Sequence, residues 1–247
     1  MLVGALLMAG CGGGTPPEPD PTGPPPTQEP QARAQLAGLA AAAQDRTLAA
    51  SYVLSAAGRP DRTVAVWLAT DGSWRVDIPG GALGGTADVA VASTGAGLFQ
   101  CALAAPSCAR IGDPDARLAA RVDPRIQRPF VYARSVLTNP AAPLAVSSAE
   151  PLAGVTGSCY SVETTTASVA SPLDVGIYCY ADDGTLTGAR LSFGTLVLSG
   201  APAAAPPSIT MPGPVTADPP LGMAAPPPPP TPSVEPSTAE PSPSGQG

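Results

Sequence analysis

Apolar and polar positions along the chain follow a helical spacing first and then alternate. Residues 31–48 are rich in alanine, and their leucines fall near one stripe of a helix, which predicts an amphipathic helix over this range. Beyond Ser51 the apolar residues recur at every second position, as in strands with one buried face. We expect strands over Ser51–Ala57, Arg62–Ala69, Ser73–Ile78, Ala87–Ser93, Gly97–Ala102, Gly157–Thr165, Asp174–Tyr180 and Thr185–Leu198. Short turns separate them, so the pattern predicts an α+β domain built on an antiparallel meander.

The turn around Asp71-Gly72 fixes which side chains share a face. A three-residue loop, Thr70-Asp71-Gly72, with a left-handed Gly72 in a bulge, brings all the large apolar residues of the two flanking strands to one side. Those residues are Val64, Val66, Leu68, Trp74, Val76 and Ile78. The same register places Trp67 opposite Arg75 on the other side, where a cation–π contact is expected. A second loop of this kind is predicted at Asp182-Asp183-Gly184.

Composition sets the bounds of this domain. Of the 34 prolines, 24 lie in residues 12–30 and 201–247. We therefore expect a single folded domain over residues 31–200, preceded by an extended Pro- and Gly-rich tether over residues 11–30. Residues 201–247 are expected to be a disordered or polyproline II tail.

Charge and chemistry exclude several classes of function. All 12 basic residues are arginines, so the chain has neither the commonest general base, histidine, nor a Schiff-base lysine. The domain is close to electroneutral, which argues against binding to nucleic acid. The closest carboxylate pairs, Asp113 with Asp115 and Asp182 with Asp183, have no supporting ligand spacing for a metal. We expect no catalytic residue, no cofactor and no metal site, and hence no enzyme.

Arginines are concentrated between residues 110 and 134. They stand at Arg110, Arg117, Arg121, Arg125, Arg128 and Arg134. Such a cluster can contact lipid phosphate. An ordinary solvated face, partly neutralised by neighbouring aspartates, is the alternative that we favour.

Four cysteines besides Cys11 indicate an oxidising compartment. They are Cys101, Cys108, Cys159 and Cys179, and three connectivities are possible. We favour Cys101 with Cys108 and Cys159 with Cys179, since each pair fits across an antiparallel hairpin. A zinc site is the rival interpretation, but the spacing lacks paired CxxC knuckles.

The N-terminus indicates export and lipidation. Residues 1–10 form a short apolar run, and Leu7 to Cys11 resemble a bacterial lipobox, in which the cysteine thiol receives a diacylglycerol. Because no basic residue precedes Arg33, we expect the true start codon to lie upstream. Cys11 is then the acylated mature N-terminus, which attaches the protein to the extracytoplasmic face of the cell membrane. A chance match in a cytoplasmic protein is the alternative.

The order of these features resembles the LolA and LppX group of lipid-handling proteins. The lipobox, the Ala-rich helix, the strand from Trp74 to Pro79 and the stretch ending at Cys101 follow one another as in that group. The segments at Cys159 and Tyr178 resemble uncharacterised lipoproteins of high-GC Gram-positive bacteria. The likeness covers residues 33–198. It implies a curved half-barrel of antiparallel strands, packed on helices around an apolar cavity.

This resemblance suggests lipid binding as the function, and one other hypothesis competes with it. The six apolar residues of the Asp71-Gly72 hairpin become candidates to line a cavity for a lipid or glycolipid of the cell envelope, although ordinary core packing explains them as well. The competing hypothesis is a non-enzymatic accessory lipoprotein without a ligand cavity, with an unknown protein partner. A void of a few hundred Å³ favours the first hypothesis, and a filled core favours the second.

Overall fold

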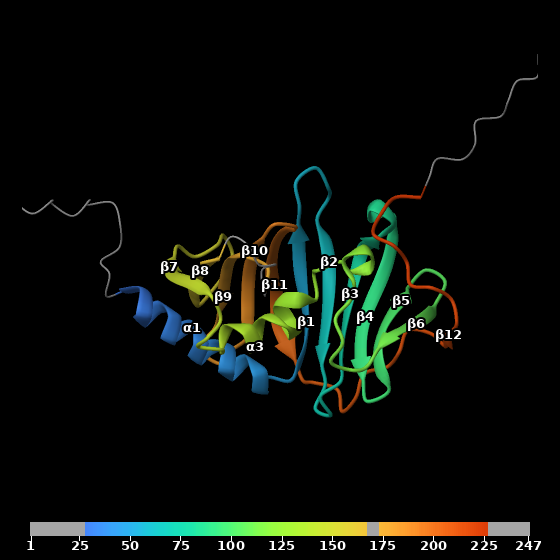
Figure 1. The fold of residues 1–247 in the computed structure, drawn as a ribbon, viewed down its shortest axis with the longest axis horizontal. Helices are drawn as coiled ribbons and strands as arrows, with labels where there is room; N and C mark the ends of the chain where they lie inside the picture. The colour runs from blue at the N-terminus through green and yellow to red at the C-terminus, as the bar shows by residue number, and fades with distance from the viewer. Residues whose placement is uncertain (1–27, 167–172, 227–247) are drawn as a thin grey trace, which may run out of the picture.

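A large antiparallel sheet that curves without closing dominates the structure (Figure 1). The computed structural model describes residues 28–166 and 173–226. Within them the sheet has 12 strands in the order β12-β6-β5-β4-β3-β2-β1-β11-β10-β9-β8-β7. The strands are β1 Leu48–Ser55, β2 Arg62–Leu68, β3 Trp74–Ala82, β4 Ala87–Thr94, β5 Gly97–Ala102, β6 Ser107–Gly112, β7 Leu144–Ala149, β8 Ser158–Thr164, β9 Gly176–Tyr180, β10 Leu186–Leu191, β11 Gly194–Ala203 and β12 Val215–Thr216. The expected α+β class with an antiparallel sheet is confirmed.

The predicted hairpin register is also confirmed. Trp67 lies opposite Arg75, and Gly72 has a φ of 82° in a loop closed by a 2.9 Å bond from the Ala69 amide to the Ser73 carbonyl. The loop before β10 repeats this geometry, with a φ of 83° at Gly184. Bulges interrupt the ladders, most clearly in β3 between Ile78 and Ala82, and such irregularities let a sheet coil.

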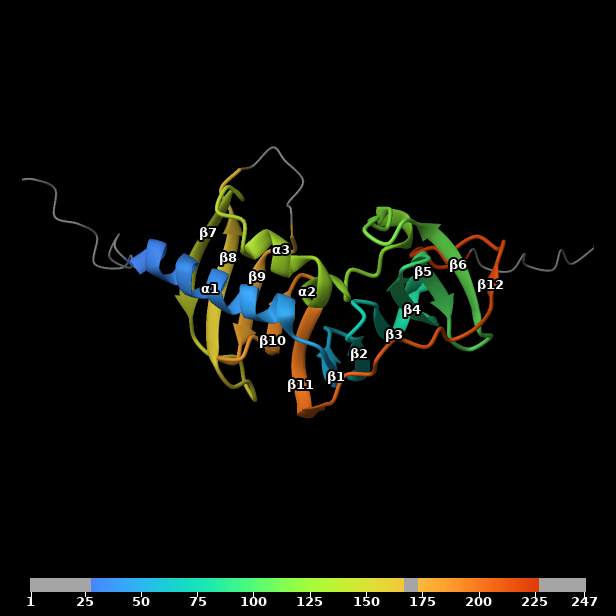
Figure 2. The same cartoon turned by 90° about the horizontal axis from the view of Figure 1, so that it is seen from below.

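The helices lie inside the curve of the sheet (Figure 2). They are α1 Gln28–Asp45, α2 Arg128–Val131 and α3 Ala133–Leu137, with single 3₁₀ turns at η1 Leu83–Gly85 and η2 Ala120–Val122. Helix α1 packs on β7 and on α3, at the end of the sheet that carries β7 to β10. The resulting core joins helix residues such as Leu36 and Phe130 to the inner face of the strands. We call the inner side of the sheet, on which the helices lie, the concave face, and the opposite side the convex face. The helices α1, α2 and α3 together are called the cover.

Residues beyond Ala203 differ from the expected disordered tail. The segment 204–226, which we call the strap, runs along the sheet and pairs β12 in parallel with β6. Carbonyls of Pro206, Pro207 and Pro214 accept hydrogen bonds from the backbone amides of Thr70, Asp71 and Cys108, respectively. Proline lacks an amide donor but keeps its acceptor, so a Pro-rich segment can bind a strand edge that composition alone does not reveal. The domain therefore extends beyond the predicted boundary at residue 200.

Element boundaries differ elsewhere too. The first helix begins and ends earlier than predicted, and Leu48 opens β1 instead of closing the helix. The predicted strand over 185–198 is two strands, β10 and β11, joined at a tight turn. Strands β7 and β12 were not predicted, and β6 was implied only by the expected Cys101–Cys108 hairpin. The signal segment 1–10, Cys11, the tether as far as residue 27 and the tail from residue 227 lie outside the described residues.

Candidate functional site

The six apolar side chains expected to line a cavity all lie on the concave face. Val64, Val66, Val76 and Ile78 are fully buried in the main core, while Leu68 and Trp74 are partly buried against it. The Trp74 ring packs edge-on against Tyr132, at 6.1 Å between centroids. Most of these side chains are therefore ordinary core. Val66 and Leu68 alone among the six line the apolar pocket at the helix–sheet boundary.

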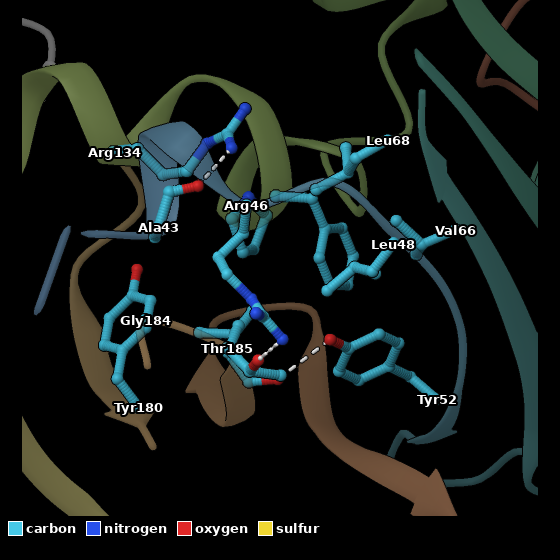
Figure 3. A pocket seen from close by; sticks show the side chains of 13 residues that line it. Ala43, Arg46, Leu48, Tyr52, Val66, Leu68, Arg134, Tyr180, Gly184 and Thr185 are labelled. Carbon is cyan, nitrogen blue, oxygen red and sulfur yellow. Dashed lines mark hydrogen bonds between the residues drawn. The ribbon is translucent and has the colours of Figure 1, made fainter. Parts of the chain in front are cut away.

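That pocket lies where α1 ends and β1 begins (Figure 3). It is lined by residues of the three helices, of β1 and β2, and of the hairpin from Tyr180 at the end of β9 to Leu186 at the start of β10. Its volume is about 20 Å³, which is about the space that one water molecule requires. A volume this small does not admit an acyl chain.

Tyrosines surround the pocket in contrasting environments. The Tyr52 hydroxyl donates a 2.8 Å hydrogen bond to the Leu186 carbonyl, and its ring lies 4.7 Å from the ring of Phe130. The Tyr180 hydroxyl is buried and has no hydrogen-bond partner among the described residues. Burial raises the pKa of both phenols above the ordinary value, so both stay neutral. Tyr180 thus presents a neutral, unpaired hydroxyl beside apolar side chains.

Arginine side chains link the helices of the concave face to neighbouring backbone carbonyls. Arg33 on α1 donates to several carbonyls of the connection from α3 to β7, at 2.7 Å for Ala142 and 3.1 Å for Pro140, and also to Leu144. Arg134 on α3 donates to the Ala43 carbonyl of α1 at 2.6 Å (Figure 3). Burial lowers the pKa of Arg134, and the carbonyl contact satisfies part of its donor set.

A buried ionic cluster holds the start of α2. The Asp123 carboxylate accepts hydrogen bonds from the backbone amide of Arg125, from the Gln127 amide and from the Arg128 guanidinium. Asp174, also buried, pairs with Arg125 and Arg128. Although burial lowers the pKa of Arg128, the hydrogen bonds and charges of the two aspartates raise it above the ordinary value. The cluster is a structural anchor between the cover and the sheet.

The predicted arginine cluster is therefore divided among separate tasks. Arg125 and Arg128 pair with buried aspartates, Arg134 binds a carbonyl of α1, and Arg117 lies 5.3 Å from the Tyr132 ring centroid. Asp123 is one of the neighbouring aspartates expected to neutralise the cluster, but the other partners and those of Arg33 were not expected from the sequence. Most of them lie tens of residues away in the chain, up to 111 for Arg33 with Leu144, so no local pattern reveals them.

Both predicted disulfides are confirmed. Cys101 bonds to Cys108 and Cys159 to Cys179, and the second bridge sets Tyr160 opposite Tyr178 as predicted. Both bridges lie on the convex face, in small apolar clusters of their own. Met211 of the strap packs against the first bridge.

Among residues 28–166 and 173–226, no helix is long and apolar enough to cross a membrane. No protein-family model matches this chain, and a search of curated proteins finds no match. Inference about function therefore rests on the residues themselves.

Proposed function

We propose that this chain is a lipid-anchored extracytoplasmic lipoprotein that binds a hydrophobic molecule of the cell envelope on its concave face. The observation that carries the proposal is an apolar concave face on a curved sheet, covered by α1 and two short helices. This arrangement supports the resemblance to the LolA and LppX group. Since the closed pocket is about 20 Å³, binding requires the helical cover to move away from the sheet.

The composition of the cover supports such a movement. The buried residues of α1 are Ala32, Leu36, Ala40 and Ala43, and the partly buried Leu39 packs beside them, so two leucines and three methyl groups make most of its apolar contact. The free energy of separating two surfaces scales with the apolar area exposed, at about 25 cal/mol per Å². Separating α1 from the sheet therefore exposes little apolar area, and the hydrogen bonds of Arg33 and Arg134 are the main interactions that must break. An acyl chain entering behind it restores the lost burial.

The extracytoplasmic location is supported by covalent chemistry. Two disulfides persist in oxidising compartments and are rare in the cytosol of mesophiles. The lipobox-like segment ending at Cys11 supplies an acylation site, and acyl chains hold a protein on a bilayer at about 0.8 kcal/mol per buried methylene.

A filled core favours a second candidate. If the cover never opens, the protein is a non-enzymatic accessory lipoprotein that acts through its outer surface. The small volume of the helix–sheet pocket is the observation that favours this alternative.

Native mass spectrometry of protein purified from envelopes in detergent-free buffer separates the two candidates. We expect a co-purifying mass of lipid size and a rise in melting temperature when that lipid is added back. Leu68→Arg, which places a charge in the pocket lining, should abolish both effects. Ala65→Arg, on the same strand but on the convex face, is the matched control and should retain them. A bare polypeptide with no lipid-dependent thermal shift supports the accessory protein.

A further inference from the structure

A second pocket lies at the opposite end of the strands that line the first. It has a volume of about 360 Å³ and opens where β1 ends, β2 begins and β10 turns into β11. Its lining combines two arginines, Arg59 and Arg62, with the apolar side chains of Ile126, Phe193 and Met223. It is therefore much larger than the pocket of Figure 3 and carries charge at its rim.

Neither arginine has a carboxylate within ion-pair distance in the described part of the chain. Arg59 donates to the Gly84 carbonyl at 3.0 Å, and Arg62 to the Pro79 carbonyl at 2.6 Å. Each guanidinium thus uses part of its donor set on neutral backbone carbonyls and has no directly paired carboxylate among the described residues. Asp61, the acidic neighbour in the sequence, is bonded to the Ser55 hydroxyl at 2.6 Å instead.

Glycines make room for both guanidiniums. A Cβ at Gly80 would lie 2.5 Å from Arg62 Nη1, and a Cβ at Gly85 would overlap Arg59. Both glycines also have positive φ values, 60° and 100°, that side chains disfavour. The backbone around η1 is therefore shaped to receive these two cations.

The two charges also act on each other. Burial lowers the pKa of Arg62, and the positive charge of Arg59 lowers it further, while Asp88 raises it in part. The Asp88 carboxylate accepts a 2.7 Å bond from the Gly80 amide, so it is partly engaged at the same rim. The net charge of Arg59, Arg62 and Asp88 is positive, and a bound anion relieves the repulsion between the guanidiniums.

An apolar surface continues inward from these charges. On the concave side of β2 the residues read Arg62, Val64, Val66 and Leu68, so a guanidinium at the rim is followed by aliphatic groups. Leu54, which lies opposite Arg62 on β1, belongs to the same core, as does Ile126 in the loop before α2. A cationic rim followed by an apolar interior is complementary to an amphiphile with an anionic head group.

We propose that the pocket at Arg59 and Arg62 binds the anionic head group, a carboxylate or phosphate, of an amphiphile whose chain extends along the concave face towards Leu68. The planar fork of a guanidinium suits such oxyanions, because it donates two parallel hydrogen bonds. This inference rests on the proposed function, since the chain occupies the face that the cover must expose.

The test compares three probes on the full chain carrying Cys11→Ser, which cannot be acylated, with both disulfides formed. The probes are oleate, oleyl alcohol and inorganic phosphate, and binding is followed by calorimetry and by thermal shift. We expect oleate to bind at least about tenfold more tightly than oleyl alcohol, since a guanidinium forms stronger hydrogen bonds with a carboxylate than with a neutral hydroxyl. We expect inorganic phosphate alone to bind weakly, because it lacks the apolar chain.

Variants assign the difference to the two arginines. Arg59→Gln and Arg62→Gln should each remove most of the preference for oleate, and Arg62→Lys should retain part of it. Arg190→Gln, an exposed arginine of β10 with no partner among the described residues, is the charge-matched control and should change nothing. Because Arg59 is exposed, its variant should fold even if Arg62→Gln does not.

Each outcome is decisive. If oleate and oleyl alcohol bind equally to the unsubstituted protein, or if Arg59→Gln keeps the preference, the head-group site is wrong while the proposed function stands. If neither amphiphile binds, both are wrong. Tight binding of inorganic phosphate without any binding of oleate indicates a small-anion site and overturns the amphiphile assignment.

Discussion

The guanidinium carbon of Arg75 lies 5.0 Å from the ring centroid of Trp67, directly across the β2–β3 ladder on the convex face. Two bonds of 2.6 Å join Arg75 to the Asp77 carboxylate, and a third, of 2.8 Å, reaches the Thr210 carbonyl of the strap. Arg75 therefore connects the sheet to a segment 135 residues later in the chain. A planar cation is needed to meet the ring, the carboxylate and the carbonyl together.

Arg75→Ala should release the strap near Thr210. We expect a loss of about 1–3 kcal/mol in the free energy of unfolding and faster proteolysis within residues 204–212, since a charge-assisted bond to the strap is removed. Denaturant titration and limited proteolysis measure the two effects. Arg190→Ala should leave both unchanged, and a protease pattern identical in the two variants contradicts the role of Arg75.

Two tyrosines of β9 should respond oppositely to loss of the hydroxyl. The Tyr178 hydroxyl donates a 2.5 Å bond to the Asp174 carbonyl, whereas the Tyr180 hydroxyl is buried without a partner in the described chain. Tyr178→Phe should therefore cost about 1 kcal/mol, while Tyr180→Phe should be neutral or stabilising. Melting curves of the two variants measure these changes in stability. A larger loss for Tyr180→Phe than for Tyr178→Phe would contradict the assignment of a hydrogen bond to Tyr178 alone.

The two disulfides should contribute unequally to stability. Their sequence separations are 7 and 20 residues, for Cys101–Cys108 and Cys159–Cys179 respectively. Loop-closure entropy assigns about 2.4 and about 3.3 kcal/mol to loops of those lengths. Denaturant titration of the paired Cys→Ala variants tests this order. Equal losses show that contacts of the reduced chain, rather than loop length, determine the contribution.

Stability should fall in acid partly through Asp183. Hydrogen bonds from Thr185 hold the pKa of this carboxyl below its ordinary value of 3.8, and Arg46 lowers it further. A carboxyl whose folded pKa is depressed stabilises the fold above the unfolded pKa, and this contribution disappears as the pH falls through the folded pKa. Asp183→Asn should thus reduce the melting temperature at pH 6 and weaken its decrease below about pH 4. Asp182→Asn, in the same turn, is the control and should leave the decrease as steep as in the parent.

Membrane attachment should depend on Cys11. Metabolic labelling with a palmitate analogue should mark the parent protein and leave Cys11→Ala unmarked, because the thiol carries the acyl group in a lipobox. The variant should also appear in the soluble envelope fraction. A Cys11→Ala protein that stays membrane-bound removes the anchor from the proposed function.

Alternation and turn chemistry predicted the strands whose pairing register is set by a nearby turn or disulfide. The Asp71-Gly72 loop fixed one hairpin, and the spacing from Cys159 to Cys179 fixed another, since neither constraint spans more than 20 residues. The edge strands β7 and β12 were not predicted. The two residues of β12 carry no periodicity, and β7 has only small residues at three of its six positions, Ser147, Ser148 and Ala149.

The candidate site was less predictable than the fold. Periodicity identified the apolar side of β2 and β3, but it could not show whether the helices fill the space above it. The partners of Arg59 and Arg62 are backbone carbonyls of the irregular segment around η1. Every residue has a backbone carbonyl, so the residue types in the sequence do not indicate which carbonyls the two arginines bind.

The pairing of β12 with β6 also limits growth of the sheet. An open strand edge is a template on which a second chain can add, and proteins block such edges with short or Pro-containing segments. Here Pro212 and Pro214 flank the approach to β12, and neither has an amide to offer an incoming strand. The same proline-rich composition that suggests an unstructured tail thus leaves a neighbouring copy only a two-residue strand to pair with at this border of the sheet.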